Sequence, residues 1–197
     1  MPNWVSNYLQ ITGDKEKITK IVDVLKADES RDKLFETLIG LEPGADYSGE
    51  NWYDLNVNRF GCKWDTPYVL EEFDIDETSI NFGIETAWSP PIQFAIRLCQ
   101  MYDVSCEISY SEPGNDFAGI TRIKPDGTYV EEDYEFLEGM YKHNMGFWEW
   151  VDGEVSFWKE EGMTEEELRA GRLSFLTDED FAKVMEMFND CEVEGEL

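Results

Sequence analysis

The stretch from Phe82 to Pro91 constrains the fold more than any other, because a strand pattern ends there and a helix pattern begins. Before it, apolar residues alternate with polar residues, as in a strand with one buried face: Ile80, Phe82 and Ile84. Within it, Ser89 is a good helix N-cap and Pro90 suits the first helical position. Apolar residues then recur at helical spacing at Ala95, Leu98, Cys99 and Tyr102. A second alternating run over 105–110 completes a β-α-β unit with its helix over 91–102.

A strand and a helix of the same kind precede this unit. Tyr8–Thr12 alternates as a strand, and Asp14 can cap a helix over 15–26. Between the two helices the patterns are weaker. The segment 34–41 fits either a strand or a short helix. The segment 52–64 indicates a strand with a turn, and the segment 68–73 indicates a further strand. The order β-α-β-β-α-β predicts an α+β, ferredoxin-like fold, in which two helices cover one face of a four-stranded antiparallel sheet. We expect Leu9–Ile11 beside Ile80–Ile84 at its centre.

The C-terminal part predicts an extension of hairpins and helices. A turn at 124–128 indicates one hairpin, and Asp152-Gly153 indicates a second over 147–158. Thr164 with Glu167 forms a capping box for a short helix, and Thr177 caps a final one. We therefore expect a ferredoxin-like domain over 1–125 and an acidic, aromatic-rich extension over 126–197 packed on it.

Four short segments occur together in an order and spacing that resemble a known family. They are Met1–Trp4 with Asn7, Gly61–Asp65, Thr86–Pro91, and Glu112-Pro-Gly with Asp116–Gly119. Together they resemble the YubB-type ferredoxin-like domain family of phages, plasmids and other mobile elements, over roughly residues 1 to 125. The resemblance implies a ferredoxin-like fold and a mobile-element origin. It transfers no catalytic residue, and Val5 stands where many relatives have a cysteine.

Charge limits the partners of this chain. It holds 44 acidic and 16 basic residues, a net charge of −28. Because so few Lys and Arg are available to displace phosphate counterions, we expect no direct binding to nucleic acid or to an anionic membrane. Solubility of a small domain needs only about 2–8 charges. With no apolar run of the roughly 18 residues that span a bilayer and no signal-peptide pattern, we expect the cytoplasm of a host cell.

No group of residues favours catalysis. The carboxylates between Glu71 and Glu77 could bind a metal, but they lack the spacing of a calcium loop. The four cysteines have no zinc-ligand spacing, and His143 has no nucleophile at motif spacing. We therefore expect no cofactor, no metal and no enzyme activity.

The acidic excess is concentrated in the extension, where 131–197 holds 21 acidic and 5 basic residues. The candidate acidic surface consists of Glu131, Glu132, Asp133, Glu160, Glu161, Glu165, Glu166, Glu167, Asp178, Glu179 and Asp180. Trp148 and Trp150 are candidate aromatic contacts, because large apolar groups occupy both faces of the expected hairpin.

Carboxylates on a rigid scaffold can imitate the phosphates of a duplex, and this analogy of charge sets our leading hypothesis. The chain is expected to be a non-enzymatic phage or mobile-element protein that inhibits a host defence protein with a basic nucleic-acid-binding cleft. Two alternatives stay open: an accessory protein-interaction module without mimicry, and a carboxylate metal-dependent enzyme.

Overall fold

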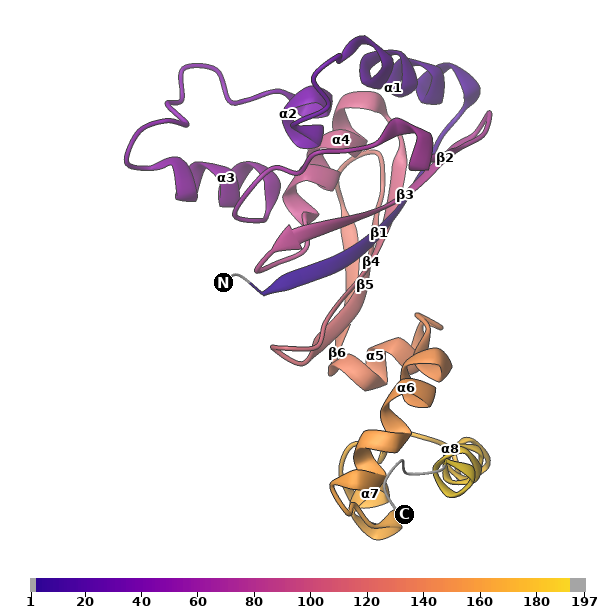
Figure 1. Cartoon of the computed structure of the whole chain (residues 1–197). Helices are drawn as coiled ribbons and strands as arrows, with labels where there is room; N and C mark the ends of the chain where they lie inside the picture. Colours follow the sequence, from indigo (N-terminus) through magenta and orange to yellow (C-terminus); the bar gives the residue numbers. More distant parts are fainter. Residues whose placement is uncertain (1–2, 192–197) are drawn as a thin grey trace. The chain divides into compact units, whose positions relative to one another are not determined.

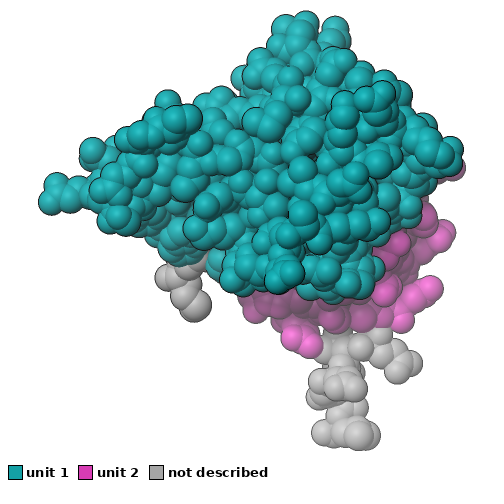
Figure 2. Space-filling model, turned by 90° about the horizontal axis from the view of Figure 1, so that it is seen from above, with its two compact units in different colours: residues 1–115, 119–133 teal, residues 116–118, 134–197 magenta. Residues whose placement is uncertain are grey.

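The computed structural model describes residues 3–191, which divide into two compact units (Figure 2). Unit 1 comprises residues 1–115 and 119–133, and unit 2 comprises 116–118 and 134–197. Unit 1 contains the predicted helices α1 and α4, and unit 2 contains the helices α5 to α8. None of the helices in the described part of the chain is long and apolar enough to cross a membrane.

The sheet is antiparallel, and its six strands lie in the order β2-β3-β1-β4-β5-β6 (Figure 1). In that order the strands are Asp74–Ile75, Ser79–Ala87, Trp4–Thr12, Ser105–Glu112, Phe117–Ile123 and Tyr129–Tyr134. β1 lies between β3 and β4, and Leu9 is opposite both Phe82 and Ile108. The predicted central pair of β1 and β3 is confirmed, and the sheet has two strands more than the four expected.

Helices cover one face of this sheet. Along β1, the side chains of Val5, Asn7, Leu9 and Ile11 are buried, and those between them are exposed. The helices of unit 1 are α1 (Lys15–Ala27), α2 (Leu34–Ile39), α3 (Trp52–Phe60) and α4 (Ile92–Tyr102). Each fully buried leucine or isoleucine in such a face stabilises the fold by about 1.5–3 kcal/mol. The alternation read from the sequence is therefore the alternation between core and open sheet face.

Two segments expected as strands have other structures. The segment 52–64 contains the helix α3, which ends at Gly61 in the left-handed region with φ 90°. The Phe60-Gly61 bend is thus a helix C-cap, a position that favours glycine. The segment 68–73 contains the 3-10 turn η1 (Leu70–Glu72), in which the Phe73 N–H donates to the Leu70 carbonyl. Only β2, two residues long, follows it as a strand.

Helix α4 begins later than the sequence indicates. Its N-cap is Pro91, and its first residue is Ile92. The Ser89 hydroxyl donates to the Gly61 carbonyl at 2.6 Å, so it holds the end of α3 instead of capping α4. Ser89 and Pro90 therefore mark the strand-to-helix turn correctly, but the cap is displaced by two residues.

The expected domain boundary falls within a hairpin. β5 and β6 are joined by the turn at 124–128, in which the Lys124 N–H donates to the Thr128 carbonyl at 2.9 Å. This hairpin spans the expected boundary between residues 125 and 126, and residues 119–133 belong to unit 1. Packing of the extension on the ferredoxin-like domain stays a prediction.

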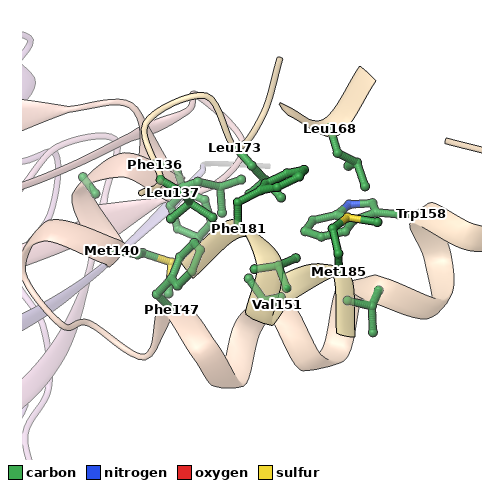
Figure 3. Close-up of a cluster of buried hydrophobic side chains, with 14 residues drawn as sticks. Phe136, Leu137, Met140, Phe147, Val151, Trp158, Leu168, Leu173, Phe181 and Met185 are labelled. Atoms are coloured by element: carbon green, nitrogen blue, oxygen red, sulfur yellow. The ribbon is translucent and has the colours of Figure 1, made fainter. Parts of the chain in front are cut away.

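Unit 2 has a core of its own. Its helices are α5 (Phe136–Lys142), α6 (Phe147–Glu160), α7 (Glu165–Ala170) and α8 (Asp178–Asp190). Figure 3 shows two ends of the core: one holds Trp158, Leu168 and Met185, and the other holds Phe136, Leu137, Met140 and Phe147. Trp158, at 0% exposed, is among the largest fully buried side chains of the chain.

The hairpin expected over 147–158 is wrong, because this segment is the helix α6. Its buried residues are Phe147, Val151, Val155 and Trp158, spaced four, four and three apart, which is the period of one helix face. Asp152 and Gly153, interpreted from the sequence as a turn, lie on the exposed side of the helix. The apolar residues on "both faces" of the expected strand thus belong to a helix with a wide buried stripe.

Candidate functional site

The carboxylates of Glu131, Glu132 and Asp133 on β6 form hydrogen bonds and an ion pair within unit 1. Glu131 accepts a hydrogen bond from the Tyr110 hydroxyl at 3.2 Å, and Asp133 accepts one from the same hydroxyl. Burial, together with the Asp133 carboxylate, raises the pKa of Tyr110. Glu132 forms an ion pair with Arg122, which also pairs with Glu107. These three carboxylates therefore tie β6 to Tyr110 of β4 and Arg122 of β5, and a partner would have to compete for them.

Four other predicted acids lie close together in sequence on unit 2. Glu160 and Glu161 end helix α6, and Glu165 and Glu166 begin helix α7 after a short connection. All four are exposed, and none forms an ion pair with a residue that the structure describes. We call these four residues the α6–α7 acidic patch. Together with Glu179, these residues are the predicted acids for which the described chain supplies no hydrogen-bond or ion-pair partner.

Glu167, the next residue, has a structural task. Its carboxylate accepts hydrogen bonds from the backbone N–H and the hydroxyl of Thr164, at 2.9 and 2.8 Å, which completes the predicted capping box. The backbone hydrogen bond from Thr164 lowers the pKa of Glu167. A capping box of this kind satisfies two donors that would otherwise lack partners at the helix start.

The acids at the start of α8 are also used within unit 2. Asp180 accepts hydrogen bonds from the hydroxyls of Tyr141, at 2.5 Å, and Thr177, at 2.7 Å. The bond from Tyr141 is the main reason why the pKa of Asp180 is lowered. Asp178 forms an ion pair with Arg169. Glu179 is exposed beside them, so this run leaves one carboxylate for a partner.

Helix electrostatics separate these acids further. A carboxylate in the first turn of a helix is favoured by the helix dipole by about 0.3–1 kcal/mol, and one in the last turn is disfavoured. Glu165 and Glu166 stand at the favoured end of α7, whereas Glu160 and Glu161 stand at the disfavoured end of α6. The dipole of α6 therefore does not stabilise the carboxylates of Glu160 and Glu161. Of the predicted acidic residues, Glu160 and Glu161 are therefore the two whose presence the stability of the fold explains least.

The two predicted aromatic contacts lie within unit 2. Trp150 is half-buried, with its ring centroid 5.6 Å from that of Phe136 and 6.0 Å from that of Trp158. Trp148 is half-buried beneath the Lys183 ammonium, which lies 3.7 Å from the ring centroid. Both rings pack against the core of this unit. Their contact with a partner stays a prediction.

The carboxylates between Glu71 and Glu77 do not converge on a metal position. Glu71 pairs with Arg31 at 2.7 Å, and Glu77 pairs with Lys15. Asp76 accepts hydrogen bonds from the N–H groups of Thr78 and Ser79, which close the turn before β3. Over residues 3–191, no three His, Cys, Asp or Glu side chains are grouped so that they could hold a metal ion.

A groove beside β3 was not predicted from the sequence. It has a volume of about 600 Å³ and lies within unit 1. Its walls come from β1, β3 and the segment before β2: Ser6, Asn7, Thr66, Pro67, Tyr68, Val69, Glu72, Phe73, Phe82, Gly83, Ile84 and Glu85. The segment 68–73, which forms part of its wall, is expected from the sequence to be a strand and contains the turn η1 instead.

Residues 63–147 match a family model described as the ferredoxin-like domain in Api92-like protein. The matched segment includes β3, α4 and β4, the unit from which the fold was first predicted. The chain therefore contains a ferredoxin-like domain, and the match begins and ends later than the expected range of 1–125. No curated protein and no solved structure matches the chain.

Proposed function

We propose that this ferredoxin-like protein is a non-enzymatic inhibitor from a phage or mobile element. It would bind a host nucleic-acid-handling protein, such as a defence nuclease, by placing carboxylates in that protein's basic cleft. The α6–α7 acidic patch supports this proposal most directly. Its four carboxylates are exposed and unpaired among the described residues, and two of them stand where the helix dipole disfavours them.

The net charge of −28 supports the same proposal from the whole chain. An excess of one sign attracts oppositely charged surfaces and speeds association with them. The residues 131–133 and the start of α8 contribute less to this proposal, because internal hydrogen bonds and ion pairs already occupy most of their carboxylates. The YubB-type resemblance supports the mobile-element origin.

The test compares two variants of equal charge. In the patch variant, Glu160, Glu161, Glu165 and Glu166 are all replaced by Gln. In the control variant, four exposed acids of unit 1 are neutralised: Asp23→Asn, Glu29→Gln, Glu42→Gln and Glu50→Gln. Glu167 is left unchanged, because its replacement would break the capping box.

Each protein is immobilised and exposed to a lysate of a bacterial host at low and at physiological salt. We expect the wild type and the control variant to retain the same basic protein, and the patch variant to lose it. Binding should weaken steeply with salt, since the screening length falls to about 8 Å at 0.15 M. Added duplex DNA should release the captured protein. If the amount of captured protein changes neither with salt nor with added duplex DNA, the mimicry hypothesis is contradicted.

A second function, an accessory protein-interaction module without mimicry, is favoured by the groove beside β3. In that case a captured partner would be insensitive to the patch variant and to duplex DNA. The third function, a carboxylate metal-dependent enzyme, predicts a stoichiometric divalent ion in protein purified without chelator. Metal analysis of such protein separates it from the other two.

A further inference from the structure

The groove beside β3 exists because β2 is short. β2 pairs with β3 only at two positions, Asp74 opposite Asn81 and Ile75 opposite Ile80. The preceding chain then turns away through η1 and approaches β3 again only where the Lys63 N–H donates to the Ala87 carbonyl at 3.4 Å. Between these two points, no strand of the described chain pairs with residues 82–86 on this side of β3. At about 3.3 Å per residue, the unpaired length is roughly 16 Å.

The hydrogen bonds at the two ends of the unpaired part of β3 show which of its backbone groups face the groove. On this side of β3, the Ser79 carbonyl accepts from the Asp76 N–H and the Ala87 carbonyl accepts from Lys63. On the other side, the Trp88 N–H donates to the Asn3 carbonyl. Because backbone groups of alternate residues in a strand face the same side, the N–H and C=O groups of Gly83 and Glu85 face the groove. No backbone group of residues 3–191 pairs with them on this side, so they are strand-edge groups of the kind that pair with an added strand.

Gly83 leaves room for a second backbone. A Cβ atom built on it would meet only the Asn7 carbonyl oxygen, at 3.7 Å. No side chain of residue 83 therefore obstructs the groove, and glycine within a strand often marks a position where another backbone approaches closely. The volume of about 600 Å³ also lies within the range of about 300–1,000 Å³ found for ligand sites.

Asn7, in the wall of the groove, has a hydrogen-bond acceptor without a partner. The residue is 5% exposed, and its Oδ1 has no partner in the described chain. The orientation of the amide is fixed by its neighbours. Nδ2 donates to the Val5 carbonyl at 2.8 Å and to Thr86 Oγ1 at 2.9 Å, and that hydroxyl donates its own hydrogen to the Ser89 carbonyl. Buried acceptors are rarely left unpaired in folded proteins, so this oxygen is expected to accept from an ordered water or from a bound molecule.

The side chains of the groove define the chemistry of that occupant. Pro67, Val69 and Phe73 are apolar, and Glu72 and Glu85 are acidic. No lysine or arginine is among the described residues of its walls. An occupant that fits this lining carries apolar and basic side chains and no carboxylates.

We propose that the groove binds a short extended peptide with alternating apolar and basic side chains, which adds as a strand to the outer edge of β3. Its backbone pairs with Gly83 and Glu85, its basic side chains lie beside Glu85 on the open face, and its apolar side chains contact Pro67, Val69 and Phe73 on the other. Strand addition of this kind takes affinity from main-chain hydrogen bonds and specificity from side-chain contacts. This surface is separate from the α6–α7 acidic patch, so the proposal goes beyond the proposed function.

The probe is a display library of random hexapeptides with blocked ends, selected on the full chain. We expect enriched sequences to alternate apolar residues with Lys or Arg. One enriched peptide is then synthesised in three forms: unmodified, and N-methylated at either set of alternate amides. Only alternate peptide N–H groups face β3 and donate to it. Methylation of that set should abolish binding, and methylation of the set that faces away should leave binding unchanged.

Two variants at Gly83 give a matched pair. Gly83→Pro removes the N–H that faces the groove and leaves the pairing with β1, as proline at a free strand edge does. Gly83→Ala keeps that N–H and adds a Cβ in available space. We expect peptide binding to weaken by about tenfold or more in Gly83→Pro, the equivalent of about 1.4 kcal/mol, and to be retained in Gly83→Ala. The melting temperature of each variant checks its folding.

Amide hydrogen exchange tests the proposal in the unaltered chain, whatever the stability of the proline variant. Exchange at Gly83 and Glu85 should slow when the peptide is bound. Enrichment of no peptide, enrichment of acidic peptides, or binding that leaves both amides unprotected would overturn the proposal. Protection of these amides on self-association of the chain without peptide would assign the edge to a second copy, and would overturn it as well. None of these outcomes depends on the α6–α7 acidic patch.

Discussion

The Tyr68 hydroxyl lies 3.1 Å from Asp28 Oδ2 and 3.1 Å from the Leu25 carbonyl, so one wall of the β3 groove is fixed to the end of α1. Asp28 also accepts hydrogen bonds from Ser30 and from the Thr37 hydroxyl on α2. Hydrogen bonds from Ser30, with those from Thr37 and Tyr68, lower the pKa of Asp28 to about 2. Burial, with the nearby Asp28 carboxylate, raises the pKa of Tyr68 to about 12. One carboxylate thus joins α1, α2 and the groove.

The first prediction concerns the pH dependence of this junction. A carboxyl whose pKa is lower in the folded than in the unfolded chain stabilises the fold above the unfolded pKa, near 3.9, and this contribution is lost as the pH falls toward the folded pKa. We therefore expect Asp28→Asn to be less stable than the wild type at neutral pH, and the difference to shrink between about pH 4 and pH 2. Urea unfolding of both proteins at several pH values measures it. Asp23→Asn, an exposed change on the same helix, is the control. A difference that stays constant with pH would contradict the assignment.

The second prediction tests the centre of the sheet. Leu9 is 0% exposed between β3 and β4, so Leu9→Ala should lower the free energy of unfolding by about 2–5 kcal/mol. Gln10, the next residue, lies on the open face, and Gln10→Ala should change it by less than about 0.5 kcal/mol. Denaturant unfolding of the two variants gives the comparison. Equal effects would show that the faces of β1 are assigned wrongly.

The third prediction distinguishes the helix α6 from the hairpin that the sequence indicates. Gly153 lies within α6, and a Cβ atom there would meet nothing within 4 Å. Gly153→Ala should therefore stabilise unit 2 by about 0.5–1 kcal/mol, because glycine is a poor helix former. In a hairpin turn the same change would destabilise, since turn glycines occupy conformations that alanine disfavours. The melting temperature and the helical circular dichroism signal give the sign.

The fourth prediction concerns the capping box of α7. Thr164→Ala removes the side-chain oxygen that accepts from the Glu167 N–H, and we expect a loss of about 0.5–2 kcal/mol. Ser174 is exposed outside the helices, and Ser174→Ala should be nearly neutral. Denaturant unfolding followed by tryptophan fluorescence gives the comparison, and the buried Trp158 of unit 2 contributes to the signal together with tryptophans of unit 1. A neutral Thr164 variant would contradict the cap.

The elements with strong periodicity were predictable because one physical rule fixes each of them. β1, β3 and β4 alternate between a covered and an open face, and α1 carries one buried stripe after its Asp14 cap. Each of these patterns has a single interpretation, so the type of each element follows, although β1 begins at Trp4, four residues before the predicted Tyr8. The family match to residues 63–147 agrees with the ferredoxin-like fold that these elements predict.

The prediction of the remaining elements failed where two physical rules compete. In α6, Asp152-Gly153 favours a turn, but the spacing of Phe147, Val151, Val155 and Trp158 favours a helix, and burial of the aromatic side chains decides the structure. In α3, Gly61 serves as a C-cap, although glycine also marks bends in strands. The groove could not be predicted, because it depends on where β2 separates from β3, a tertiary event with no local pattern.

The short β2 has a consequence for how copies of this protein behave toward one another. An unpaired strand edge exposes a chain to self-association, and proteins commonly counter it with charge. Two molecules that each carry a net charge of −28 repel as they approach, while a cationic peptide is attracted. The acidic composition would thus prevent the exposed edge of β3 from pairing with the same edge of a second copy. Because salt screens this repulsion, sedimentation should detect association of the chain only at high ionic strength.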